Sequence, residues 1–151
     1  MTFDKSGNIW FTAQGAAVIG RRDATKLPEG ARPRRIAVTK DGIWYGDYAR
    51  GFLGRLDPAT GKVTEFALPA KGASLPYAMT HDDKGKIWVA ETGVMPNRLV
   101  AFDPKVGRFT DTVATEGGDA PNTIRHMVFY APKREIWYGT DRNTVGRLEV
   151  P

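Results

Sequence analysis

One phrase occurs four times along this chain and constrains the fold more than any other feature of the sequence. Each copy carries Ile-Trp after a polar residue or glycine, and Phe, Tyr or Val follows; the copies are GNIWFTAQGAAVIGR (7–21), DGIWYGDYARGFLGR (41–55), GKIWVAETGVMPNRL (85–99) and KREIWYGTDRNTVGRL (133–148). All four tryptophans of the chain lie in these copies, at intervals of 34, 44 and 49 residues. A period in this range is typical of repeat proteins whose units bury their hydrophobic faces by stacking on one another.

The repeated units are predicted to be sheets rather than helix pairs. Each phrase is a short β-branched or aromatic run between turn-forming residues, and no apolar series with helical spacing persists for three turns. A whole unit covers residues 74–113, with strands expected at PYAMTH, IWVAE, NRLVAFD and FTDTV. The connecting segments DPATGK (57–62) and DPKVGR (103–108) place Pro and Gly where tight turns need them. The sequence therefore predicts an all-β fold, a β-propeller of four-stranded antiparallel blades.

About four blades are expected in one domain, residues 1–151, with approximate bounds 1–31, 32–73, 74–120 and 121–151. The first blade opens partway through its innermost strand, and the last ends after its third strand. An open half-ring exposes blade faces and strand edges, which natural β proteins usually avoid. Three ways of covering them are compatible with the sequence: a compact four-bladed ring, a homodimer of about eight blades, or the remainder of a longer propeller. We expect every tryptophan to pack between blades.

Composition narrows the class of partner. The net charge is +5, but Lys and Arg are dispersed over turns and only ARPRR (31–35) is clustered, so nucleic-acid binding is not predicted. The chain has no cysteine, which excludes disulfides and thiolate metal sites. No signal peptide or membrane-spanning segment is recognised, so a soluble chain without membrane contact is expected, and the compartment stays open.

The segments GNIWFT and LGRLDPATGKVTEFALP (53–69), together with inner strands that begin at proline, resemble the streptogramin lyases, also called virginiamycin B lyases. The resemblance covers essentially the whole chain and implies a propeller about half the length of a full, seven-bladed member. Members of that family open a cyclic depsipeptide antibiotic at its ester bond by metal-assisted elimination. A metal is not required for the fold itself, and Mg²⁺ is implied as a cofactor only if the chain is a lyase.

The resemblance also implies particular site residues. In similar lyases the base is a histidine eleven residues before the blade's tryptophan, and His126 stands at that distance from Trp137. Those relatives carry a glutamate two residues before this histidine, a metal-binding glutamate three after the tryptophan, and a second histidine in the preceding blade. The corresponding residues in this chain are Ile124, Thr140 and Tyr77. One family position in four is matched, and the residues predict no metal site.

Five residues are candidates for a pocket at one mouth of the propeller channel, since equivalent positions of different blades converge there. They are Arg34, Asp47, Tyr77, Glu91 and His126, with His126 as the candidate base and the others as ligand-binding residues. A guanidinium such as that of Arg34 suits a carboxylate- or phosphate-bearing ligand. We expect a non-catalytic module that binds a small molecule or protein, or assembles with itself as a homodimer. The alternative is a metal-assisted C–O lyase acting on a cyclic depsipeptide or related ester.

Overall fold

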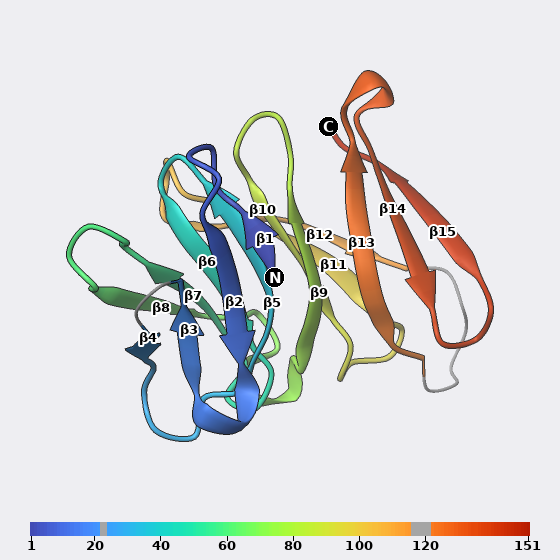
Figure 1. Ribbon diagram of the computed structural model, residues 1–151. Coiled ribbons are helices and arrows are strands. Elements are labelled where there is room, and N and C mark those ends of the chain that lie inside the picture. Colours follow the sequence, from blue (N-terminus) through green and yellow to red (C-terminus); the bar gives the residue numbers. More distant parts are fainter. Residues whose placement is uncertain (22–23, 116–121) are drawn as a thin grey trace.

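The computed structural model describes residues 1–21, 24–115 and 122–151, which form four antiparallel sheets (Figure 1). In each sheet the strands lie in chain order. The first sheet contains β1 (Thr2–Phe3), β2 (Ile9–Ala13), β3 (Val18–Gly20) and β4 (Ala24–Lys26). The second contains β5 (Pro33–Thr39), β6 (Gly42–Asp47), β7 (Phe52–Leu56) and β8 (Val63–Ala67). The third contains β9 (Pro76–His81), β10 (Ile87–Glu91), β11 (Arg98–Asp103) and β12 (Arg108–Ala114). The last contains β13 (Ile124–Tyr130), β14 (Glu135–Thr140) and β15 (Val145–Glu149).

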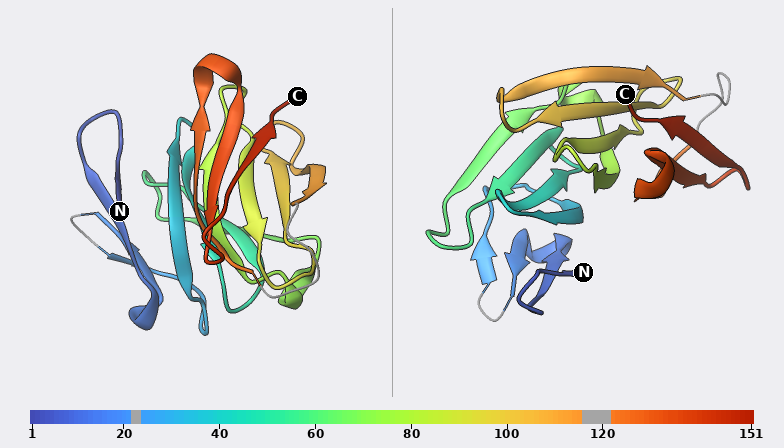
Figure 2. Two further views of the ribbon diagram at one scale, coloured as in Figure 1. Left: turned by 90° about the vertical axis from the view of Figure 1, so that its right-hand side faces the viewer. Right: turned by 90° about the horizontal axis from the view of Figure 1, so that it is seen from above.

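The four sheets are arranged as the blades of a β-propeller, so the predicted fold class is confirmed. Their first strands are the innermost: β13 packs on β9, β9 on β5, and β5 on β1. Seen from above, the sheets follow one another along an arc, with the first and last sheets at its two ends (Figure 2, right). Three short 3-10 helices, η1 (Gln14–Ala16), η2 (Lys71–Ala73) and η3 (Ala131–Lys133), lie in connections. None of the helices in the described ranges has the length and hydrophobicity that a membrane crossing requires.

The turns of the outer hairpins have the chemistry that their sequence predicts. Gly61 and Gly107 close the two DP-containing turns with φ of 72° and 70°. Asp57 and Asp103 begin these turns, and each accepts a hydrogen bond from the backbone N–H two residues later, at 2.8 Å. Positive φ is readily available to glycine and strained for other residues. These turns bring the third and fourth strands of a sheet together without a long connection.

An aromatic ring lying over a glycine explains the glycine of the repeated Gly-Arg. Tyr45 on β6 lies directly opposite Gly54 on β7, and a Cβ atom at Gly54 would lie 2.0 Å from its ring. The pairs Phe11 with Gly20 and Tyr138 with Gly146 have the same arrangement. The third sheet lacks both partners and pairs Val89 with Val100 instead. Each sheet therefore fills the same space, either with a ring over a glycine or with two valines.

The hydrophobic core lies between the sheets, because the second strands are apolar on both faces. Trp44 contacts Phe102 of the following sheet, with ring centroids 5.5 Å apart, while its neighbour Tyr45 packs with Trp10 and Ile19 of the preceding sheet. Trp10, Trp44 and Trp88 are all buried, as expected. The expectation is wrong for Trp137, which is 40% exposed. Trp137 is on the face of the last sheet that no further sheet covers.

The tryptophans also brace the inner hairpins through their indole N–H groups. The indole of Trp10 donates to Asp4 and that of Trp88 donates to Asp82, each at 3.0 Å. Both aspartates also accept backbone N–H groups of their own turn. The hydrogen bonds from the Trp10 indole and the Asn8 side chain lower the pKa of Asp4 to about 2. One carboxylate thus holds the turn and positions the large ring that the next sheet packs against.

The pairing of Tyr45 with Gly54 predicts a compensated double substitution. Gly54→Val should lower the free energy of unfolding by about 3 kcal/mol, because its side chain would collide with the Tyr45 ring. In the double variant Tyr45→Val/Gly54→Val the loss should be smaller than the sum of the single losses by about 1–3 kcal/mol, since it reproduces the Val89–Val100 pair. Urea denaturation followed by circular dichroism measures all three variants.

The control is Gly139→Val, since this strand glycine has open space where its Cβ would lie. We expect it to change stability by less than the Gly54 substitution. Strictly additive losses in the double variant would contradict the packing explanation.

Candidate functional site

The inner strands begin at one end of the propeller axis, and their second residues come together there. The first residues are equivalent by register: Pro33 lies opposite Asp47, Pro76 opposite Glu91, and Ile124 opposite Thr140. The residues that follow them are Arg34, Tyr77 and Arg125. Each of the three strand pairs also has a register irregularity at this end, which re-aims side chains. Equivalent positions of three sheets therefore meet at one mouth.

These residues and Tyr48 form a cluster of cations and aromatic rings, which we call the axial cluster: Arg34, Tyr48, Tyr77 and Arg125. The guanidinium carbon of Arg34 lies 4.6 Å from the ring centroid of Tyr48 and 4.9 Å from that of Tyr77. The two rings meet edge to face, with centroids 5.9 Å apart. The guanidinium carbon of Arg125 lies 5.4 Å from the Tyr77 ring. Cation–π contacts of this kind hold a guanidinium in place while leaving its N–H groups available.

The two arginines of the axial cluster differ in their polar partners. Arg125 forms an ion pair with Asp141 at 3.4 Å, and interaction with the Tyr77 hydroxyl raises the pKa of Arg125 above its ordinary value. Arg34 forms no ion pair with any carboxylate of the described residues, and its Nε is buried without a hydrogen-bond partner there. Buried polar groups in native proteins are nearly always satisfied. Arg34 is thus a positioned cation with unused hydrogen-bonding capacity.

A cavity of about 210 Å³ adjoins Arg34 along the axis. It is bordered by the inner strands of all four sheets, and its lining residues are Met1, Thr2, Arg34, Arg35, Ile36, Met79, His126 and Met127. The predicted site residues Arg34 and His126 therefore share one cavity, and Tyr77 contacts Arg34 beside it. Arg35 and Arg125 add positive charge, and the Arg35 side chain donates to the backbone oxygen of Arg125 at 3.1 Å. The mouth is rich in cations.

His126 does not occupy the position that counting from the tryptophan suggests. Trp88 lies opposite Thr80, whereas Trp137 lies opposite Val128, so the inner hairpin of the last sheet is one residue longer. Tyr77 lies three residues before Thr80, and Arg125 lies three residues before Val128. The equivalent of Tyr77 in the last sheet is therefore Arg125 and not His126. Arg125 was therefore missed, although counting forward from the apolar residue that begins each inner strand would have found it. Tyr48 was missed because no other copy of the phrase has an aromatic residue there.

Asp47 forms its hydrogen bonds with residues outside the axial cluster. It is fully buried, and its Oδ1 accepts the backbone N–H of Arg32 at 2.9 Å. Its Oδ2 accepts from Arg50 Nε at 2.6 Å. These bonds tie the segment before β5 to the end of β6, so the carboxylate fastens the inner strand to its neighbour.

Glu91 has the same structural role in the third sheet. It is fully buried, and its Oε1 accepts from the backbone N–H of Ala70 at 2.9 Å and from Ser74 Oγ at 2.7 Å. Its other oxygen pairs with Arg98. Both carboxylates are fully buried and are engaged by arginine and by other donors of their own surroundings, so neither is presented to the cavity as a ligand.

The residues at the mouth do not fit a Mg²⁺ site. Mg²⁺ prefers oxygen ligands in octahedral geometry. Within the described ranges no three His, Asp or Glu side chains are grouped so that they could hold a metal ion. The two candidate carboxylates, Asp47 and Glu91, each pair with their own arginine.

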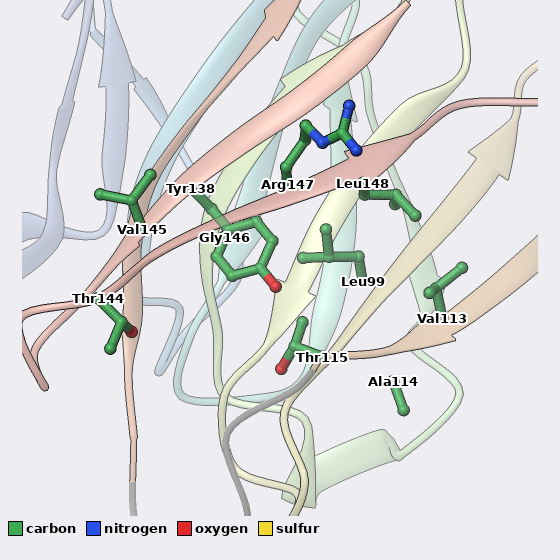
Figure 3. A pocket seen from close by; sticks show the side chains of 10 residues that line it. All are labelled: Leu99, Val113, Ala114, Thr115, Tyr138, Thr144, Val145, Gly146, Arg147 and Leu148. Carbon is green, nitrogen blue, oxygen red and sulfur yellow. The ribbon is translucent and has the colours of Figure 1, made fainter.

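A second, larger cavity of about 570 Å³ lies away from the mouth, between the third and last sheets (Figure 3). Apolar side chains from both sheets border it, among them Leu99, Val113, Tyr138 and Leu148. It lies beside β15, the outermost strand of the last sheet within the described residues. In the third sheet the corresponding place, on the face toward the preceding sheet, is filled by the fourth strand, whose Phe109 packs against Phe102 with ring centroids 5.2 Å apart. The cavity therefore results from the short last sheet.

Because the Glu91 carboxylate is buried and paired with Arg98, we expect its substitution to change stability and not the response to a metal. Glu91→Gln should lower the free energy of unfolding by roughly 2–4 kcal/mol, because Arg98 loses its charged partner in a largely buried site. Glu149→Gln, an exposed glutamate, should change it by less than about 0.5 kcal/mol. Thermal unfolding with and without Mg²⁺ measures both. Stabilisation by Mg²⁺ that disappears in Glu91→Gln would contradict the assignment.

Comparison with known proteins identifies relatives of the chain. No protein-family model matches it. It is 38% identical over 97 residues to virginiamycin B lyase of Nocardia farcinica, a match covering 60% of this chain and 33% of that protein. The selenomethionine form of Staphylococcus aureus virginiamycin B lyase matches with a TM-score of 0.78 and 22% identity, over 99% of this chain and 54% of that one. A catalytically inactive variant of that lyase, solved with quinupristin, matches with a TM-score of 0.77 and 22% identity, over 97% and 53%. The chain thus spans about half the length of these solved lyases.

Proposed function

We propose that this chain, a partial-length homologue of virginiamycin B lyase with a streptogramin lyase-like propeller fold, binds a small oxyanion ligand at the axial mouth without catalysing a reaction. The observation that supports this most directly is Arg34. Its guanidinium lies against the rings of both Tyr48 and Tyr77, while its Nε lacks a partner among the described residues. A carboxylate or phosphate group would supply two acceptors in the plane of the guanidinium.

The surroundings of Arg34 favour an anionic group over a neutral one. Arg35 and His126 border the same cavity, and Arg125 also contacts the Tyr77 ring. Asp141, which pairs with Arg125, balances part of this charge. A cavity of about 210 Å³ suits a small ligand, or one end of a larger one, since sites for drug-sized ligands are usually larger. The rings of Tyr48 and Tyr77 beside Arg34 add an apolar wall, which suits a carboxylate attached to an aromatic ring.

Benzoate is the probe that tests this proposal. We expect it to bind the wild-type chain, with neutral benzamide binding at least about tenfold more weakly, as the loss of a charge-assisted hydrogen bond predicts. Arg34→Gln should weaken benzoate binding about 10- to 100-fold, and Arg34→Lys should bind with intermediate affinity because it keeps charge but loses the planar fork. Titration calorimetry or NMR chemical-shift titration measures these affinities. Inorganic phosphate, titrated in parallel, distinguishes a preference for carboxylate from one for phosphate.

Arg108→Gln is the matched control, because Arg108 is an exposed arginine on the outer strand of the third sheet. It should leave benzoate binding unchanged. Equal losses in Arg34→Gln and Arg108→Gln would mean nonspecific attraction to a basic protein, and no binding of either anion to the wild-type chain would refute the proposed site.

The second candidate is a metal-assisted lyase, and one observation favours it: His126, the residue matched to the family's base, borders the axial cavity with Arg34. Elimination needs a base near the proton that it removes and a cation that stabilises the developing charge. The base has a candidate here, but Asp47 and Glu91, the carboxylates nearest the mouth among the candidate residues, are engaged by Arg50 and Arg98. A binding function explains more of the residues at the mouth than a catalytic function does.

Quinupristin provides the test between the two candidates. We expect the purified chain with Mg²⁺ to leave quinupristin unopened, as followed by liquid chromatography with mass spectrometry. Conversion that stops with chelator and is lost in His126→Ala would establish the lyase instead. Conversion that survives both treatments would indicate a contaminating activity, which a mock purification without the chain identifies.

A further inference from the structure

Exposed apolar side chains gather on the outward faces of the two terminal sheets. On the first sheet they are Phe3, Ile9 and Phe11, which we call the first open face. Phe3 lies directly opposite Ile9 in the sheet, and Phe11 follows on the same side by strand alternation. On the last sheet they are Val128, Tyr130, Trp137 and Val145, which we call the last open face. Val128 lies directly opposite Trp137.

Few other large apolar side chains are exposed in the described ranges. Apart from the chain end at Met1, the exposed ones outside the open faces are Met95 and Val106, which lie in separate connections of the third sheet. Single exposed apolar residues are common, but contiguous apolar faces on sheets mark interaction surfaces. The two open faces therefore need a partner.

The internal interfaces of the chain show what each open face is built to contact. At every junction one sheet contributes the face that carries its tryptophan. The following sheet contributes its opposite face, which carries the two residues that flank its tryptophan in the sequence. Trp10 packs with Ile43 and Tyr45 across the first junction. Trp88 belongs to the same cluster as Ile136 and Tyr138 across the third. The order is the same each time, and the two sides of a junction are different.

The open faces are the two unpaired halves of this same junction. The last open face carries Trp137, the equivalent of Trp10 and Trp88 in the repeated phrase. The first open face carries Ile9 and Phe11, the equivalents of Ile43 and Tyr45. Phe11 also covers Gly20 just as Tyr45 covers Gly54, so the first open face has the surface shape of a buried one.

We infer that the last open face of one copy of this chain docks on the first open face of a second copy, and that two copies close a ring head to tail. The sheets follow an arc with the two open faces at its ends (Figure 2, right). In a closed ring of two copies, the two contacts between them are identical by symmetry. This inference is independent of the proposed ligand and rests on the sheets alone.

A pair of charge-bearing substitutions tests the head-to-tail contact. Wild-type chain should have twice the mass of one copy by light scattering on a sizing column, from about 1 to 100 µM. Ile9→Lys on the first open face and Val128→Glu on the last should each give single copies, because in a ring of identical copies either change alters both contacts. An equimolar mixture of the two variants should restore the doubled mass. In that mixture one contact is unaltered and the other pairs the introduced lysine with the introduced glutamate.

The control is Val106→Glu, an exposed valine in a turn away from both open faces, which should leave the doubled mass unchanged. Circular dichroism of each single variant should match that of the wild type, and recovery in the mixture shows that both are folded. Wild-type chain with the mass of one copy at every concentration overturns the inference. A doubled mass that survives either single substitution also overturns it, because that would mean that like faces are in contact. A mass that grows beyond two copies overturns it as well, because that would mean that the copies form an open chain.

Discussion

The structure depends on covering sheets that are apolar on both faces. The second strand of each sheet places Trp on one face and Ile with an aromatic or valine residue on the other, so a single sheet has no face suited to water. Stacking satisfies both faces at once, and the largest side chains, such as Trp44 and Trp88, are buried at the junctions. At the two ends of the arc this requirement is unmet within one chain, which is why Trp137 is exposed.

The stacking also creates the candidate site. Packing the sheets radially brings the first strands β5, β9 and β13 together, and with them the second residue of each strand. Arg34, Tyr77 and Arg125 are more than 40 residues apart along the chain, yet they share one cluster of cation–π contacts. The buried acids Asp47 and Glu91 fasten these strands through arginine and backbone bonds. The buried acids thus fix the inner strands at the mouth, and the candidate ligand-binding residues lie beside them.

Sequence reasoning predicted the fold closely and the site only in part. The strands of the third sheet lie where PYAMTH, IWVAE, NRLVAFD and FTDTV place them, because alternation and turn chemistry are local properties. Arg34, Tyr77 and His126 were expected at one mouth, and they lie in or beside its cavity. Equating His126 with Tyr77 failed because one hairpin is a residue longer, a difference that shifts the register without altering the pattern of the phrase.

The sequence by itself determined the repeated unit, its four-stranded pattern and the similarity to the streptogramin lyases, since these depend on residue types at fixed spacing. Tertiary structure decided what the polar residues do. A carboxylate three residues after a tryptophan looks the same in a sequence whether it faces a metal or an arginine, and only the folded chain shows Asp47 against Arg50 and Glu91 against Arg98. It likewise left Arg34 without an acidic partner among the described residues, because the three-dimensional positions of charges set which pairs can form.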